Sequence, residues 1–422
     1  MADNYYLNRL LGIDQSNFEV SDIKDSEHEI IFYIKHKNDE RFLCQCCGTL
    51  NTSCHSKKWI TLSDMPWGSK KVKWMIYRAT ILCGCSYHHR VEKLPFRSKH
   101  HKITQRFEEH IEGLLCTHMI TVMDISKMLG LNYGLVYKID HDVLTRLLQN
   151  QEIPDPINIS VDEKSFKKRH NYVTIITDTD LKKVIWVSTG NRKESLDEFF
   201  KILGPDRCKK IKTVSKDLHR PYAVSCDEYI PQARQVADKF HVVQRLNRAC
   251  EEARKELLLS NDIRKSEKKT IKSMNWVIRH KEENMSKKTY KNLNVLKKTN
   301  EPLYEAYLLK ESFYEFFNFT PIEIGQAKKF LLDWCADVKQ TIFESYKSIA
   351  SYVERHTEVL LNIIRERRSS AISEGINRKV TVLKSMAYGY RCIHYFKLKI
   401  LQRCGVLGQF WVPESKLKGY TP

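Results

Sequence analysis

The 422-residue sequence contains no uninterrupted apolar run of about 18 residues, the length that a membrane-spanning helix needs. Its first residues contain no apolar segment of the kind found in a secretory signal peptide. Glycine and proline are scarce, at 15 and 11 residues, which argues against collagen-like or long disordered regions. We therefore expect a cytoplasmic globular protein with no membrane partner, folded into two to four domains of about 100–200 residues each.

Acidic residues are few relative to basic ones. The chain has 71 lysines and arginines against 51 aspartates and glutamates, a formal net charge of +20. Such an excess attracts phosphate polyanions and makes their binding sensitive to salt. The charge therefore favours nucleic acid as a partner, although a basic soluble protein without such a partner is the alternative.

A disulfide framework is not expected, because the 13 cysteines are odd in number and no secretory signal accompanies them. Six cysteines fall within residues 37–97. Cys44 and Cys47 form a C-x-x-C pair followed by glycine, and Cys83 and Cys85 follow the strand-like segment KVKWMIYRATILC. Two such pairs joined by a β-hairpin predict a tetrahedral zinc site.

The ligand set of this zinc site stays open. The second pair is C-x-C rather than the commoner C-x-x-C, so His88 or His89 are alternatives to Cys85. Three further candidates lie nearby, namely Cys46, Cys54 and His55. A cluster of reduced cysteines without a metal is the other interpretation.

Residues 100–150 have a helical pattern, and MDISKMLGLNYGLVYKIDHDVL within them is typical of a helix-turn-helix. Ser126 is small enough for two helices to approach, and Gly130 stands at the turn, where a positive φ is expected. The small core is predicted to contain Ile125, Leu129, Leu131, Val136 and Ile139, and the exposed recognition face Asn132, Tyr133 and Lys138. An ordinary helical hairpin is the alternative, and the charge favours DNA binding.

Residues 155–260 mix strands with helices. Strands are predicted at 157–161, 171–178, 182–188, 210–216 and 233–237, with a tight hairpin at TDTDLKK between the second and third. Three antiparallel strands followed by an alternation of strand and helix are similar to a ribonuclease-H-like fold. In that fold the first and fourth strands are neighbours. Residues 248–365 are basic and helical in pattern, which predicts an all-helical insertion, either a DNA-binding surface or a solvated one.

Two aspartates follow strand-like runs, and a glutamate lies in a later helical pattern. Asp162 ends INISV on its more polar face, Asp217 ends IKTVSK, and Glu374 lies in SSAISEGINRKV. Two divalent cations about 3.5–4 Å apart in a phosphoryl-transfer site require such bridging and flanking carboxylates. Asp238, which ends the fifth strand, is an alternative to Asp217. His241, three residues later, is either an accessory residue of this site or a packing histidine.

Several blocks along the chain resemble the DDE transposases of bacterial insertion sequences, in the ISL-type branch with an N-terminal zinc finger and a helix-turn-helix. They are LNRLLGI, CQCCG, the helix-turn-helix, VDEKSFKKRHNYVTIITD, SKDLHRPY, PQARQVADKFHVVQRLN and SEGINRKVTVLKSMAYGYRCIHYFKLKIL. Together they span nearly the whole chain. By this resemblance the catalytic triad falls on Asp162, Asp217 and Glu374. Two features depart from the pattern of this family: the C-x-C spacing of the second cysteine pair and the extra cysteine at Cys46. Both leave the identity of the zinc ligands open.

The resemblance implies an α/β multidomain protein: a zinc-binding β module, a helix-turn-helix and a ribonuclease-H-like core interrupted by a helical insertion. It implies strand cleavage and strand transfer with Mg²⁺ or Mn²⁺ at the triad, Zn²⁺ in the N-terminal module, and Arg378 and Lys379 on DNA phosphates. Terminal inverted repeats and target DNA are the expected partners of a homo-oligomer, most simply a dimer, near the bacterial nucleoid. A non-catalytic DNA-binding regulator and a nuclease without strand transfer are the competing hypotheses. The expected boundaries are 1–97 (zinc module), 98–150 (helix-turn-helix), 155–247 and 366–407 (core), 248–365 (insertion) and 408–422 (tail).

Overall fold

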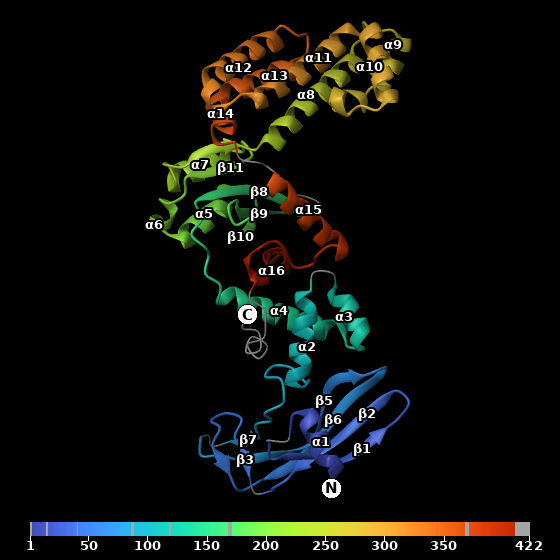
Figure 1. Cartoon of the computed structure of the whole chain (residues 1–422), viewed down its shortest axis with the longest axis vertical. Coiled ribbons are helices and arrows are strands. Elements are labelled where there is room, and N and C mark those ends of the chain that lie inside the picture. Colours follow the sequence, from blue (N-terminus) through green and yellow to red (C-terminus); the bar gives the residue numbers. More distant parts are fainter. Residues whose placement is uncertain are drawn as a thin grey trace. The chain divides into compact units, whose positions relative to one another are not determined.

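The computed structural model describes residues 2–13, 16–39, 41–85, 88–117, 120–167, 171–367 and 371–409. The chain divides into two compact units, residues 1–151 with 407–422 and residues 152–406. Both units contain strands and helices, which confirms a mixed α/β protein with more than one domain (Figure 1). Within the described part of the chain, no helix is long and apolar enough to cross a membrane.

The first unit contains a five-stranded sheet in the order β1-β2-β6-β5, with β7 paired to β6. Along β6, Val72, Trp74 and Ile76 are buried and alternate with more exposed neighbours, because successive side chains of a strand point to opposite faces. Their face forms the core of this sheet, which helix α1 joins through Leu11. The bounds are α1 Ala2–Leu11, β1 Phe18–Asp25, β2 Glu29–His36, β3 Phe42–Leu43, β4 Leu50–Asn51, β5 Ser56–Trp67, β6 Lys70–Leu82 and β7 His89–Val91.

Three helices complete the first unit: α2 (Gln105–Cys116), α3 (Val122–Leu129) and α4 (Tyr133–Gln149). Gly130 ends α3 with a φ of 61°, a left-handed conformation that costs glycine little because it has no Cβ. Ser126 donates a hydrogen bond to the Leu131 carbonyl across the turn. Ile125, Val136 and Ile139 are fully buried between the helices, and Leu129 and Leu131 pack partly buried against them, in the arrangement that the sequence predicts.

The second unit is built on a mixed sheet in the order β10-β9-β8-β11-β12. β8 (Asn158–Lys167), β9 (Asn171–Asp178) and β10 (Lys183–Thr189) form an antiparallel meander. β11 (Thr213–Lys216) and β12 (Arg234–Ala237) continue the sheet in parallel with β8. The order and directions, with helices added from the C-terminal part, are consistent with a ribonuclease-H-like core.

Helices pack on this sheet from two stretches of the chain. α5 (Lys193–Leu203), α6 (Pro205–Cys208) and α7 (Arg220–Tyr229) pack on the side of Ile159, Val161 and Val214. α15 (Ala371–Met386) contacts β8, and α16 (Ile393–Cys404) packs beside β10. Gly405 follows α16 at a point where a Cβ would lie 2.4 Å from the Val184 carbonyl oxygen, so only glycine permits this close approach.

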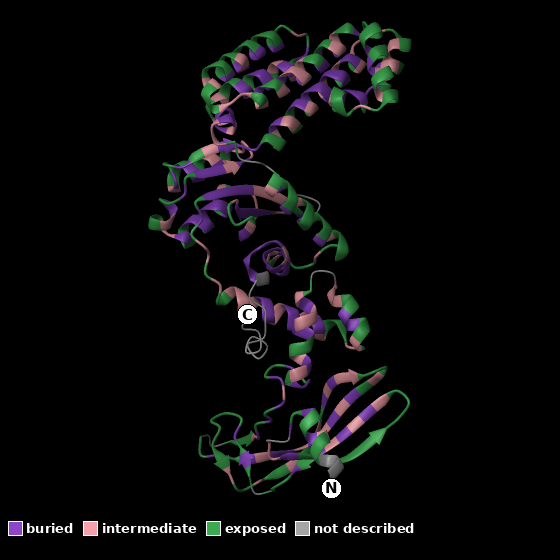
Figure 2. Cartoon of the chain, viewed as in Figure 1, coloured by how far each residue is buried: buried purple, intermediate pink, exposed green. Residues whose placement is uncertain are grey.

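Helices alone occupy the segment between β12 and α15, all of which is described up to residue 367. They are α8 (Lys239–Leu259), α9 (Lys265–Ser273), α10 (Lys287–Thr299), α11 (Glu301–Ser312), α12 (Ile324–Lys339), α13 (Glu344–Arg355) and α14 (Thr357–Glu366), with short 3-10 turns between some of them. Their buried faces form one core, coloured purple in Figure 2, that is continuous with Ala237 of β12. α14 returns to the sheet, where Asn362 donates a hydrogen bond to the Gln235 carbonyl at 2.7 Å.

The first strand of the sheet differs from its predicted extent. It begins at Asn158, continues to Lys167, and leaves Ile157 exposed, whereas the sequence pattern placed the strand at 157–161. The reason is that β9 pairs with β8 well beyond the point where β11 ends. Asp162 therefore lies inside a strand rather than at its end.

Candidate catalytic centre and metal sites

Three aspartates lie at one level of the sheet in the second unit. Lys216 of β11 is paired with Val161 of β8 and with Ala237 of β12, so the next residue on each strand is an aspartate. These residues are Asp162, Asp217 and Asp238. Because side chains alternate along a strand, paired positions share a face, and we infer that all three carboxylates lie on one side. The parallel half of the sheet ends at this level.

Helix α15 brings Glu374 to the same face. The Ser373 hydroxyl donates to the Ser160 hydroxyl at 3.0 Å, and the Asn377 amide donates to the Asp162 carboxylate. Ser373 and Asn377 are four residues apart on the helix, a rise of about 6 Å, and Ser160 and Asp162 are about equally far apart on the strand. The helix can therefore make both contacts while it lies along β8. Glu374 lies between them on the helix. With Asp238 it lines a cavity of about 480 Å³, together with Lys164 and Arg378.

Asp162 is held in its charged form. Burial disfavours its carboxylate, but the contacts with His241 and Asn377 outweigh that effect and keep the pKa of Asp162 below its usual value. His241 Nε2 lies 3.6 Å from Asp162 Oδ1, and this carboxylate is the main cause of a raised pKa of His241, which Asp217 and Asp238 also favour. His241 therefore lies at the carboxylate cluster, on the first turn of α8.

Asp238 has a structural role as well. Its side chain caps α8 by accepting a hydrogen bond from the Phe240 backbone N–H at 2.8 Å. Burial raises the pKa of Asp238, and the nearby charges of Asp162 and Asp217 raise it further. Asp217 is less enclosed, with a quarter of its side chain exposed, and has no such capping role; its carboxylate accepts from the adjacent Leu218 N–H.

The donor set at this face suits a divalent cation. Carboxylate oxygens are the ligands that Mg²⁺ and Mn²⁺ prefer. Strand register and helix α15 bring four residues with carboxylate side chains to one region of the sheet. Burial is the main cause of the raised pKa of Asp238, and the negative charges of Asp162 and Asp217 contribute to it. Asp162, Asp217, Asp238 and Glu374 are thus the residues that could hold such ions.

Two residues of this face were missed in the sequence analysis. Asn377 donates a hydrogen bond to the Asp162 carboxylate. It follows Glu374 by three residues, and this spacing places both side chains on the same face of the helix. Lys164 follows Asp162 by two residues on the same strand, and therefore shares its side of the sheet. Both spacings were available in the sequence once the helix and strand had been assigned.

Four cysteine sulfurs converge in the first unit. Sγ atoms of Cys44, Cys47, Cys83 and Cys85 all lie within 4.8 Å of one another. The Cys47–Cys83 and Cys44–Cys85 sulfurs are 3.5 and 3.8 Å apart. Sulfurs bound to one tetrahedral zinc at about 2.3 Å lie about 3.8 Å apart, so the cluster fits this ion.

The other candidate ligands fall outside this group. They are Cys46, Cys54, His55, His88 and His89. The His55 and His89 rings contact each other, tilted by 41° with centroids 4.0 Å apart, and Cys54 donates to backbone carbonyls. Hydrogen bonds from Thr49, assisted by the Cys83 thiol, lower the pKa of Cys47 to about 6, which favours the thiolate that metals bind.

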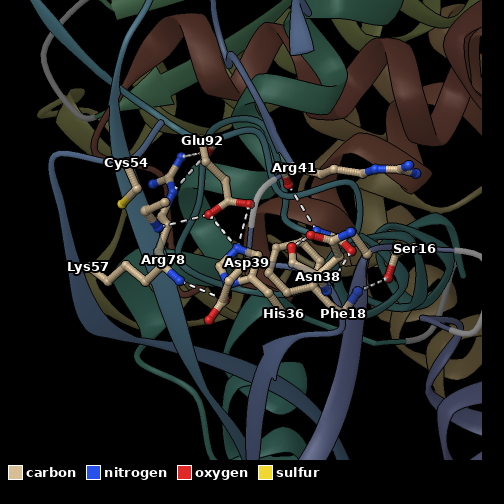
Figure 3. Close-up of polar contacts among 12 residues, drawn as sticks. Ser16, Phe18, His36, Asn38, Asp39, Arg41, Cys54, Lys57, Arg78 and Glu92 are labelled. Carbon is tan, nitrogen blue, oxygen red and sulfur yellow. Dashed lines mark hydrogen bonds and ion pairs between the residues drawn. The ribbon is translucent and has the colours of Figure 1, made fainter. Parts of the chain in front are cut away.

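A buried polar cluster forms around His36 and Glu92 in the first unit (Figure 3). His36 Nε2 lies 2.8 and 2.9 Å from the two Glu92 carboxylate oxygens, one of which also accepts from the Ala79 backbone N–H. Arg78 donates to the Glu92 carbonyl and, at 2.7 Å, to Gln45. Since Glu92 is bridged to Cys44 through the backbone, these bonds connect the cysteine segment to β2 and β6.

The predicted DNA-contacting residues of the first unit lie at the start of α4. Asn132 caps this helix by accepting from the Gly134 N–H, so its carboxamide oxygen is already occupied. Tyr133 is 46% exposed and stacks on Tyr137, and Lys138 is exposed on the same helix. In the second unit, Arg378 and Lys379 are exposed on α15 next to Glu374.

Comparisons with known proteins relate most of the chain to transposases. A transposase from insertion sequence element IS1001 of Bordetella parapertussis is 26% identical over 361 residues, covering 85% of this chain and 87% of the relative. Transposases of element IS1557 from two strains of Mycobacterium tuberculosis, CDC 1551 / Oshkosh and H37Rv, are each 24% identical over 417 residues, covering 90% of this chain and 91% of the relative. The family model described as transposase, of the ISL3 type of DDE enzymes, matches residues 159–400. The chain therefore belongs to the ISL3 family of DDE transposases, enzymes of insertion sequences that transfer phosphoryl groups.

Proposed function

We propose that this transposase binds the terminal inverted repeats of its insertion sequence and performs metal-dependent strand cleavage followed by strand transfer. Asp162, Asp217 and Glu374 are the proposed catalytic triad, with Asp238 and His241 as accessory residues. The observation that carries this proposal is the strand register that places Asp162 and Asp217 side by side, with Glu374 on the helix bonded to Asp162.

Asp217 remains our choice over Asp238 for the second ligand. The capping bond to Phe240 explains why an aspartate stands at position 238 without any metal. Asp217 directly follows Lys216, which pairs with the Val161 neighbour of Asp162, and the carboxylate of Asp217 is more accessible than that of Asp238. Asp162 and Asp217 would hold one cation, and Glu374 would complete the site of a second.

The reaction has two phosphoryl-transfer steps. In the first, a water oxygen attacks phosphorus at the element end, the bond from phosphorus to the 3′ oxygen breaks, and that oxygen takes up a proton. In the second, the resulting 3′-hydroxyl oxygen loses its proton and attacks phosphorus in target DNA, whose own 3′ oxygen leaves and is protonated. Bound Mg²⁺ or Mn²⁺ supplies Lewis-acid activation of the attacking oxygen and neutralises charge at phosphorus. Lys164 and Arg378, on the cavity wall, are placed to hold neighbouring phosphates.

Recognition of the DNA ends is assigned to the first unit. Asn132, Tyr133 and Lys138 would contact DNA from the start of α4, within a helix-turn-helix formed by α3 and α4, and the zinc module at the four cysteines would support this surface. Arg378 and Lys379 would hold phosphates beside Glu374. Because two ends have to be cut together, we propose a homo-oligomer, most simply a dimer.

The proposed domain boundaries follow these roles. Residues 1–97 hold the zinc module and 98–150 the helix-turn-helix. Residues 155–247 and 366–407 form the ribonuclease-H-like core, and 248–365 the helical insertion between its parts. Of the tail, 408–422, all residues after 409 lie outside the described part of the chain.

The test is a strand-transfer assay. Purified protein is incubated with labelled element-end DNA, a target plasmid and Mg²⁺, alongside Asp162→Ala, Asp217→Ala, Asp238→Ala and Glu374→Ala. The proposal expects joined product from the wild type, loss of product in the first, second and fourth variants, and a weaker effect of Asp238→Ala. Loss in Asp238→Ala but not in Asp217→Ala would move the second ligand to Asp238.

Two other outcomes would replace the proposed function. Binding of element-end DNA without cleavage would indicate a regulator derived from a transposase. Cleavage without joined product would indicate a nuclease that lacks the transfer step.

A further inference from the structure

Helix α8 carries an arginine beside the proposed catalytic aspartates. The Arg245 guanidinium lies 3.8 Å from Asp217 Oδ1, one helical turn after His241. At this distance the two groups form an ion pair but are too far apart for a hydrogen bond. Among the described residues, Arg245 donates no hydrogen bond, and 44% of its side chain is exposed. Its five N–H donors are therefore available to a ligand at the carboxylate cluster.

An aromatic ring of the helical insertion holds this arginine in place. The guanidinium carbon of Arg245 lies 4.6 Å from the centre of the Tyr352 ring, on α13. The Tyr352 hydroxyl is buried and has no hydrogen-bond partner among the described residues, so the ring face is what Tyr352 contributes. A guanidinium stacked on a ring keeps its N–H groups pointing outward in its own plane, where they can meet two oxygens of a phosphate.

We propose that Arg245 binds a non-bridging oxygen of the phosphate that is being cleaved, and that Tyr352 positions Arg245 for this contact. The inference rests on the proposed function, since it requires that Asp217 belongs to the catalytic site. Arg245 is then a catalytic residue and Tyr352 a positioning residue. The helical insertion contributes to the chemistry through this stacking contact.

Substitutions at both positions test the proposal in the full-length protein. The rate of cleavage of labelled element-end duplex is measured with protein in excess, so that every substrate molecule is bound. Arg245→Ala should slow cleavage roughly 100-fold, the cost of removing one donor to a developing oxyanion, with little change in DNA affinity. Arg245→Lys keeps the charge and should recover only part of the rate, because an ammonium cannot form the paired contact.

Tyr352 is tested through the stacking that it provides. Tyr352→Leu, which removes the ring, should slow cleavage. Tyr352→Phe keeps the ring and removes only the unpartnered hydroxyl, so it should cleave at the wild-type rate. Arg248→Ala, at an exposed arginine three residues further along α8, is the matched control and should cleave at the wild-type rate.

Sulfur substitution at the cleaved phosphate separates a substrate contact from a structural role. With duplexes carrying a single phosphorothioate of defined stereochemistry, one isomer should react more slowly with the wild type, in Mn²⁺ as in Mg²⁺. Arg245→Ala should remove this isomer-specific penalty, since two changes that break the same contact do not add. An unchanged penalty, or an Arg245→Ala rate within twofold of the wild type, would overturn the inference while leaving the proposed function intact. Absence of cleavage by the wild type would instead overturn the proposed function, and the inference with it.

Discussion

The cysteine cluster of the first unit and the carboxylate cluster of the second are positioned by different means. The carboxylates follow the register of a five-stranded sheet whose ladders and core need no ion. Cys44 and Cys47 lie in residues 41–55, whose only strands are the two-residue β3 and β4, and Cys83 and Cys85 follow the end of β6. The four sulfurs lie close to one another, and Cys44 and Cys83 also pack in a small core with Phe42, Ala79 and Ile81. A metal would therefore complete the fold at the first site and only supply reactivity at the second.

The two sites also differ in how their ligands are supported. Asp162 accepts hydrogen bonds from the Glu163 backbone N–H and from Asn377 of a distant helix, so its position is determined before any cation binds. Cys44 is supported through Glu92, whose carboxylate is buried against His36. Removing an ion, a ligand or a supporting residue should therefore have different consequences in the two units.

Zinc removal should have the largest effect. Chelation should increase hydrogen exchange in residues 41–55 and 83–94, around the four cysteines, while residues 157–237 stay protected, because binding energy of about 10–16 kcal/mol is folding energy in small zinc modules. The measurement is hydrogen exchange by mass spectrometry before and after chelation, with the bound zinc counted by elemental analysis. Equal protection of both regions after chelation would show that the cysteine segment folds without metal.

Asp162→Asn should lower the rate of strand cleavage roughly 1,000-fold. The reason is that a bound metal ion stabilises the charge of the transition state by several kcal/mol, and the proposed metal site needs the Asp162 carboxylate. The melting temperature should change little, since the sheet positions residue 162 without the charge. Glu163→Gln is the control, because Glu163 lies on the opposite face, where it accepts a hydrogen bond from Asn191. A large drop in melting temperature with Asp162→Asn would contradict the contrast between the two sites.

Glu92→Gln should weaken zinc retention by about 1–3 kcal/mol, because one buried donor, at His36 or at the Ala79 N–H, would lose its acceptor. Competition for zinc with a chromophoric chelator measures this change. Asp25→Asn is the matched control, since Asp25 is exposed, pairs with Lys70 and should matter little. Equal zinc affinities for Glu92→Gln and the wild type would show that the cluster does not support the site.

Lys138→Ala should have the smallest effect. Loss of one phosphate contact should weaken binding of element-end DNA several-fold and reduce by about one the slope of log affinity against log salt concentration. The cleavage rate of bound DNA should stay unchanged. Binding titrations at several salt concentrations measure both quantities. Lys209→Ala, at an exposed lysine of the second unit, should leave affinity and slope as they are. A slower cleavage of bound DNA by Lys138→Ala would show that the units are coupled in the reaction.

Local patterns in the sequence were sufficient for most elements of both units. The alternation of apolar and polar residues predicted the five strands of the second unit to within a few residues, except for the longer β8. The helix pair around Gly130 and the two cysteine pairs followed from turn chemistry and ligand spacing. These features have periods or spacings of a few residues, so neighbouring residues determine them.

The sequence by itself thus pointed to the candidate residues: two cysteine pairs, aspartates that follow strand-like runs and a helical glutamate, in a family whose members are transposases. Only the tertiary structure decided which of them meet. It aligned Asp238 with Asp162 and Asp217, bonded Asn377 to Asp162, chose Cys85 over the nearby histidines, and stacked Arg245 on Tyr352. The physical reason is that strand register and helix packing join residues up to about two hundred positions apart, and no local pattern encodes such a pairing.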